Sequence, residues 1–171
     1  MFLMVDDDTV VIEKALEDFI IYIEDRALDH GESVSPPFCS SHWTISNHPP
    51  TRPGDKYADK SGVTKEIYPK NFYPPFCSGT CYVISLTYAR NIYRTAVLTN
   101  PDKFHLEDVL FTGILRVKAD IDIPKEVKGI CQHYDKITKT EEIRNLVLKY
   151  CLENNISQSS CFITDMMTYI K

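Results

Sequence analysis

The sequence has no long hydrophobic run, few glycines and no excess of basic charge. No apolar stretch approaches the ~20 residues that span a bilayer. The apolar start at 1–5 is too short for a signal peptide and has no basic flank. The net charge is −5 and lysine and arginine form no stripe, which argues against nucleic acid as the main partner. The 171 residues, 43% of them hydrophobic, suit one globular core and are too few for two domains.

The six cysteines do not have the spacing of a zinc site. They stand at positions 39, 77, 81, 131, 151 and 161, so no two of them are separated by only two residues. An even number of cysteines is compatible with disulfides in an oxidising compartment. The N-glycosylation triplet Asn155-Ile156-Ser157 points the same way. The spacing does not decide how the cysteines pair.

The apolar residues 1–5 run directly into three aspartates, Asp6, Asp7 and Asp8. A short apolar run with polar bounds predicts a buried strand, and ligands of open α/β sheets gather at the carboxyl ends of such strands. On extended backbone, Asp6 and Asp8 share a face and Asp7 lies on the other. A divalent cation with oxygen ligands would relieve the repulsion between these carboxylates. The alternative is a solvated acidic turn or a helix N-cap.

Helical periodicity and a long proline-rich segment follow the aspartates. Apolar residues at helical spacing predict a helix over about 12–27 that ends near Gly31. Residues 31–76 contain eight of the ten prolines, which disfavour helix and central strand. The aromatic residues among them argue against disorder. We expect an ordered loop with short edge strands, of a kind that usually has a function.

A turn of small residues, Ser78, Gly79 and Thr80, leads into a β-rich run that ends at Ser85. Ser85 is a good N-cap for a helix over 86–98. Gly79 allows the backbone to approach a ligand closely. A plain entry from loop to strand is the alternative.

The second half of the sequence predicts two further helices. The first covers about 106–117 and has Glu107 and Asp108 in its first turn, where the helix dipole favours acids whether or not they have a function. Residues 119–137 look irregular, and a helix with a capping box is expected over 141–152. The segment 161–170 is apolar enough to pack.

In this order, the motifs resemble the galactosyltransferases of glycosyltransferase family 31, the beta-1,3-galactosyl- and N-acetylglucosaminyltransferases. The resemblance covers roughly residues 1–120 and fades from 125 onward. Two positions depart from the family pattern: Tyr57 replaces the usual tryptophan after Lys56, and Cys81 replaces a glycine. The segments that carry the resemblance are Asp6-Asp7-Asp8 after the apolar run, Lys56-Tyr57, Tyr68-Pro69, Tyr73-Pro74-Pro75-Phe76-Cys77-Ser78-Gly79-Thr80 and Leu106-Glu107-Asp108-Val109 with Gly113.

The resemblance implies an α/β fold of the GT-A type, a mixed sheet flanked by helices, that binds a nucleotide-sugar donor and Mn²⁺. Family members carry an anchor, a stem and about half of the catalytic domain before the aspartates. Residues 1–171 are therefore expected to form one partial catalytic domain that lacks the N-terminal nucleotide-binding strands. The motifs fall in 1–120, and 121–171 is less defined.

The resemblance also assigns roles to individual residues. Asp108 maps onto the catalytic base, with Glu107 beside it. Asp8 maps onto the direct metal ligand, with Asp6 next to it, and His133 is the candidate third ligand as the only histidine after Asp108. The remaining residues implied to border the donor are Asp6, Asp7, Ser78, Gly79 and Thr80.

The implied function is transfer of galactose or N-acetylglucosamine, with inversion, from a UDP-sugar to a glycan acceptor on protein or lipid. The implied location is the lumenal side of the Golgi membrane, held there by an anchor that is absent from these residues. One alternative is an inactive fragment or pseudoenzyme that acts at most as a binding module. An unrelated metal-dependent hydrolase is disfavoured, because no further histidine or carboxylate cluster has the spacing to complete a two-metal site.

Overall fold

A computed structural model describes residues 1–6, 9–30, 34–40, 44–99, 101, 103–133, 145, 148–149, 151–153 and 155. Its main sheet has four strands in the order β1–β6–β3–β7. Strand β6 pairs antiparallel with both β1 and β3, and β7 pairs parallel with β3, so the sheet is mixed as predicted. The bounds of these strands are β1 (Phe2–Val5), β6 (Cys81–Ile84), β3 (Phe38–Cys39) and β7 (Lys125–Glu126).

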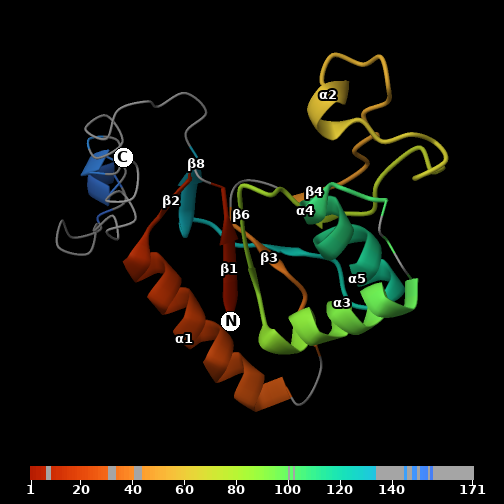
Figure 1. Ribbon diagram of the computed structural model, residues 1–171. Helices are drawn as coiled ribbons and strands as arrows, with labels where there is room; N and C mark the ends of the chain where they lie inside the picture. Colours follow the sequence, from red (N-terminus) through yellow and green to blue (C-terminus); the bar gives the residue numbers. More distant parts are fainter. Residues whose placement is uncertain are drawn as a thin grey trace, which may run out of the picture.

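Helices cover both faces of this sheet (Figure 1). Side chains alternate along β6, so that Val83 packs with Phe19 of helix α1 (Glu13–His30), while Ile84 packs with Tyr88 of helix α3 (Leu86–Thr99) on the other face. On the face of α3 lies a continuous helical run made of α4 (Glu107–Val109), the π-helical turn η1 (Leu110–Ile114) and α5 (Leu115–Lys118). The expected α/β class is therefore confirmed.

Two two-stranded sheets and one short helix accompany the main sheet and its helices in the described part of the chain. Strand β2 (Thr9–Val11) pairs antiparallel with β8 (Cys131–His133), and β4 (Thr44–Ile45) pairs antiparallel with β5 (Phe76–Cys77). The short helix α2 (Ala58–Ser61) lies within the proline-rich segment, of which the structure describes residues 34–40 and 44–76.

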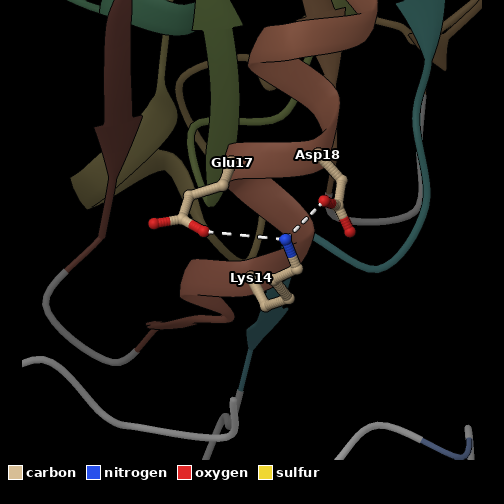
Figure 2. A network of polar contacts seen from close by, with 3 residues as sticks. All are labelled: Lys14, Glu17 and Asp18. Atoms are coloured by element: carbon tan, nitrogen blue, oxygen red, sulfur yellow. Dashed lines mark ion pairs between the residues drawn. The ribbon is translucent and has the colours of Figure 1, made fainter.

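Helix α1 turns its charged side away from the core. Lys14 Nζ lies 2.8 Å from Asp18 Oδ1 and 3.8 Å from Glu17 Oε2, and all three side chains are exposed (Figure 2). Pairs of opposite charge at these spacings stabilise a helix modestly, by about 0.2–0.5 kcal/mol each. The apolar side of the helix, with Phe19 at its centre, faces the sheet.

One disulfide lies on each face of the main sheet. The Cys81–Cys131 bond is part of the core under α1, and the Cys39–Cys77 bond is packed with Tyr82 on the opposite face. The first ties β6 to β8, and the second ties β3 to β5. Disulfides persist in oxidising compartments, which agrees with the expectation from the cysteine count.

Two expectations about strands were wrong and a third was right only in part. Strand β1 is half exposed instead of buried, because among the described residues it pairs only with β6 and lies at the edge of the sheet. Of the short edge strands expected in the proline-rich segment, β4 is one, since among the described residues it pairs only with β5. Strand β3, however, is an interior strand, since Pro36 and Pro37 precede it and leave its own N–H groups free to pair. The segment expected to be irregular contains β7 and β8.

Two further expectations lie outside the described residues, wholly or for the most part. They are the helix over 141–152 and the packed segment 161–170. Within the described part of the chain, no helix is both long enough and apolar enough to cross a membrane.

Candidate functional site

The carboxyl end of β1 lies beside the small-residue turn that enters β6. The antiparallel register pairs Val5 with Cys81, and the next hydrogen bond runs 3.1 Å from the main-chain N–H of Asp6 to the carbonyl oxygen of Thr80. The hydroxyls of Ser78 and Thr80 are 2.8 Å apart and hydrogen-bonded to each other. The first aspartate and the Ser-Gly-Thr turn, which the sequence analysis assigned to donor binding, are therefore neighbours.

Asp108 reaches this turn from the first turn of the helical run. Its Oδ2 accepts a 3.0 Å hydrogen bond from the main-chain N–H of Gly79, and its Oδ1 accepts one of 2.7 Å from the N–H of Val109. Burial raises the pKa of this carboxyl group; the two N–H donors act in the opposite direction, and the nearby Asp6 carboxylate raises it further. Asp108 is thus a half-buried, fixed carboxylate with increased basicity.

Glu107 is held by a tyrosine on β6. The hydroxyl of Tyr82 donates a hydrogen bond to Oε1 of Glu107, although Tyr82 itself is almost completely buried. Burial raises the pKa of Glu107, the Tyr82 hydrogen bond lowers it, and the Asp108 and Asp6 carboxylates raise it. Burial and the bond to Glu107 both raise the pKa of Tyr82, which keeps its proton and remains the donor.

The position of Asp108 depends on a buried threonine in the π-helical turn. Thr112 Oγ1 donates a 2.6 Å hydrogen bond to the carbonyl oxygen of Asp108 and accepts one of 2.8 Å from the N–H of Cys77. Gly113 follows, and a Cβ there would lie only 3.0 Å from the Cβ of Phe76. The missing side chain lets the helix approach β5, where the threonine bond then joins the two elements.

The carboxylates of Asp6, Glu107 and Asp108 form a local concentration of negative charge. The Asp6 carboxylate raises the pKa of both Glu107 and Asp108, and the Asp108 carboxylate raises that of Glu107. No lysine or arginine of the described residues makes an ion pair with any of the three. Such a set of oxygen donors has the chemistry that favours a hard divalent cation. Within the described ranges, however, no group of three or more metal-ligating side chains has the geometry of a complete metal site.

Not all of the predicted metal ligands lie among the described residues. Asp7 and Asp8 lie outside the described residues. The backbone of His133 lies in β8, where it pairs with Thr9, the residue that follows Asp8 in the sequence. The register therefore brings the predicted histidine beside the segment that carries the aspartates, and the roles of Asp7, Asp8 and His133 stay predictions.

The structure brings together Asp6, Ser78, Gly79, Thr80, Glu107 and Asp108. It adds Tyr82 and Thr112, which sequence analysis did not single out. Tyr82 lies in an otherwise apolar strand, and a buried tyrosine usually has a hydrogen-bond partner for its hydroxyl, so its position was a usable signal. Thr112 gave no such signal, because its partner Cys77 is distant in sequence.

The chain is similar in sequence to known galactosyltransferases. The galactosyltransferase family model matches residues 1–127 of the 171. Over 59 residues the chain is 49% identical to beta-1,3-galactosyltransferase 1 of Homo sapiens and of Mus musculus, which is 34% of this chain and 17% of the relative. Over 70 residues it is 37% identical to human beta-1,3-galactosyltransferase 2, which is 40% of this chain and 16% of that protein.

The aligned part thus spans less than a fifth of these relatives. The family model, by contrast, covers the whole arrangement of β1, the Ser-Gly-Thr turn and the helix with Glu107 and Asp108. The resemblance deduced from the motifs is confirmed, and the chain belongs to the galactosyltransferase family.

Proposed function

We propose that this chain takes part in the transfer of galactose or N-acetylglucosamine from a UDP-sugar to a hydroxyl of a glycan acceptor on protein or lipid, with inversion at the anomeric carbon. The observation that carries the proposal is the position of Asp108, fixed by the N–H groups of Gly79 and Val109 beside the end of β1. Residues 1–171 would then form one partial catalytic domain with its motifs in 1–120.

In this mechanism Asp108 is the general base. Its carboxylate takes the proton of the acceptor hydroxyl as that oxygen forms a bond to the anomeric carbon. The bond between this carbon and the phosphate oxygen breaks, and the electron pair leaves with the nucleoside diphosphate. A base whose pKa is raised by burial is better matched to a proton transfer near neutral pH, and such assistance contributes about 10²- to 10⁴-fold.

The other residues bind and orient. Asp6 and Asp7 with the turn of Ser78, Gly79 and Thr80 would border the donor, and Tyr82 would hold Glu107 beside Asp108. Asp8, with Asp6 and His133, would hold Mn²⁺, which supplies positive charge that neutralises the diphosphate of the donor. Among the described residues, no lysine or arginine makes an ion pair with Asp6, Glu107 or Asp108, and this supports a cation here.

The disulfides Cys39–Cys77 and Cys81–Cys131 support a lumenal location, for which the Golgi membrane is our proposal. The alternative function, an inactive fragment that binds its partner without transfer, is kept because the aligned part covers so little of the relatives.

The test uses the purified chain with radiolabelled UDP-galactose and UDP-N-acetylglucosamine, glycan acceptors, and Mn²⁺ present or absent. Asp108→Asn is expected to reduce transfer about 10²- to 10⁴-fold and to leave donor affinity unchanged in calorimetry. Asp59→Asn, in the exposed helix α2, is the matched control and should keep full activity. Asp8→Ala should remove Mn²⁺-dependent nucleotide binding.

Other outcomes of these experiments would exclude individual residue roles or one of the two functions. Retained turnover in Asp108→Asn would exclude Asp108 as the base, and unchanged Mn²⁺-dependent binding in Asp8→Ala would exclude Asp8 as a ligand. Donor binding by the wild-type chain without transfer, over all acceptors, would establish the binding-module alternative. Absence of both binding and transfer would refute both functions for these residues.

A further inference from the structure

A pocket of about 490 Å³ lies on the other side of the helical run from the acidic site. Its lining includes Leu110, Ile114 and Val117, which recur every three or four residues and so share one helix face. Asp108 and Thr112 belong to a different face, which is bonded to Gly79 and Cys77. Of the acidic site residues that the structure describes, Asp6, Glu107 and Asp108, none lines this pocket.

The floor of the pocket is apolar. It includes Phe104 and Ile114, each of which packs against two parts of the core. One part is the cluster that contains Tyr73 and Phe76, and the other lies under α3. Val117, on the pocket side of α5, remains half exposed. The floor therefore lies where two parts of the core meet, and its residues pack against both of them.

The rim is positively charged. Among the described residues, Lys70, Lys103 and Lys118 line the pocket together with a single acid, Glu66. The three lysines are exposed, and none of them makes an ion pair with a residue that the structure describes. Their aliphatic stems extend the apolar wall, while their ammonium groups stay at its edge.

We propose that this pocket binds a single-chain anionic amphiphile, with its alkyl chain on the apolar floor and its acidic headgroup at the three lysines. The volume is within the range of sites that hold one small ligand, about 300–1,000 Å³. A saccharide fits the floor poorly, because its buried hydroxyls would lose water without gaining partners there. An alkyl chain loses only apolar hydration, and the rim supplies the complementary charge.

The probe is decyl phosphate, kept below its critical micelle concentration and titrated into the full chain by calorimetry. One saturable site is expected. The double variant Lys103→Glu/Lys118→Glu should weaken binding at least about ten-fold, because two attractive charges become repulsive. The matched control Lys125→Glu/Lys128→Glu changes two exposed lysines outside the pocket and should stay within about two-fold.

A second pair of variants tests the floor. Val117→Asp places a carboxylate against the bound chain and should also weaken binding about ten-fold, while Val97→Asp, at a similarly exposed position on α3, should not. Both variants are expected to fold, since each position is at least half exposed, and thermal unfolding checks this.

Three results would overturn the proposal. The first is no saturable binding of decyl phosphate, or equal weakening by the pocket and control variants. The second is equal affinity for inorganic phosphate, which would indicate a simple anion site. The third is binding only to phosphatidylcholine vesicles that contain phosphatidylserine, which would indicate a membrane-surface contact. The test requires no transfer activity, so its outcome is independent of the proposed function.

Discussion

The main-chain N–H of Gly79 donates a 3.0 Å hydrogen bond to Oδ2 of Asp108, which lies 29 residues later in the chain. This bond joins the Ser-Gly-Thr turn to the first turn of α4. The two motifs that the sequence analysis assigned separately, one to donor binding and one to catalysis, are therefore held at a fixed distance from each other.

The first prediction concerns a side chain added at Gly79, next to this bond. A Cβ at Gly79 would meet Oδ2 of Asp108 at 3.5 Å, an ordinary van der Waals contact, and the N–H donor would remain. Gly79→Ala is therefore expected to fold with a change in unfolding free energy of at most about 1 kcal/mol. The added methyl group would occupy the surface on which we place the donor sugar, so UDP-galactose affinity should fall about ten-fold.

Thermal unfolding and calorimetry on the same preparation measure the two effects of Gly79→Ala. Unchanged UDP-galactose affinity with a normal melting temperature would show that the turn does not border the donor.

The second prediction concerns Tyr82. Its hydroxyl donates a hydrogen bond to Glu107. This bond lowers the pKa of Glu107, whereas burial raises it. Tyr82→Phe should therefore raise the pKa of Glu107, which NMR of the labelled Glu107 carboxyl carbon can follow over a pH titration. Tyr88→Phe removes a similar buried hydroxyl, bonded to the Phe111 carbonyl at 2.7 Å, and should leave the Glu107 titration unchanged.

If Glu107 titrates at the same pH in wild type and Tyr82→Phe, the hydroxyl does not control its ionisation. If both tyrosine variants shift it equally, the cause is a general loosening of the fold.

Local signals explain why the longer helices could be predicted. The N-cap at Ser85 is real, since its Oγ accepts a 3.0 Å hydrogen bond from the N–H of Tyr88. The periodic apolar residues of α1 and α3 face the core as expected. Capping and periodicity act within a few residues, so a single sequence contains the information needed.

The features that escaped prediction depend on partners far along the chain. Strands β7 and β8 are two and three residues long, and each is defined by pairing with β3 or β2. The exposure of β1 depends on its number of neighbours, which an apolar run does not reveal. In the site, Asp108 was predicted by resemblance, whereas Tyr82 was missed because its role depends on Glu107, 25 residues later.

The third prediction concerns Thr112. Thr112→Val keeps the shape of the side chain but removes the acceptor of the buried Cys77 N–H and the donor to the Asp108 carbonyl. An unsatisfied buried donor costs about 1–3 kcal/mol, so we expect that loss of unfolding free energy in guanidinium under non-reducing conditions. Thr95→Val removes a comparable bond to the Asn91 carbonyl on α3, where the N–H groups keep their partners.

The control Thr95→Val should change stability by no more than about 0.5 kcal/mol. Equal losses in the two variants would mean that the threonine bond between η1 and β5 has no special structural role.

The last prediction uses the sign of the Glu107 pKa shift. Burial raises the pKa of Glu107 in the folded protein above its ordinary value, so the folded state takes up a proton more readily than the unfolded state. The ionised carboxylate therefore lowers the stability of the fold at neutral pH. This loss diminishes as the pH falls through the raised pKa of the folded state, and it is gone below the ordinary pKa of the unfolded state. Glu107→Gln has no charge and can still accept the hydrogen bond from Tyr82.

Glu107→Gln should accordingly raise the melting temperature at pH 7, and the difference from wild type should shrink steadily on acidification. The exposed Glu126→Gln on β7 is the control and should change the melting temperature less at pH 7. A site residue that destabilises its own fold is expected where the charge has a function. A lower melting temperature for Glu107→Gln at pH 7 would mean that the Tyr82–Glu107 contact stabilises the fold more than desolvation of the carboxylate disfavours it. The structural explanation would then replace the functional one.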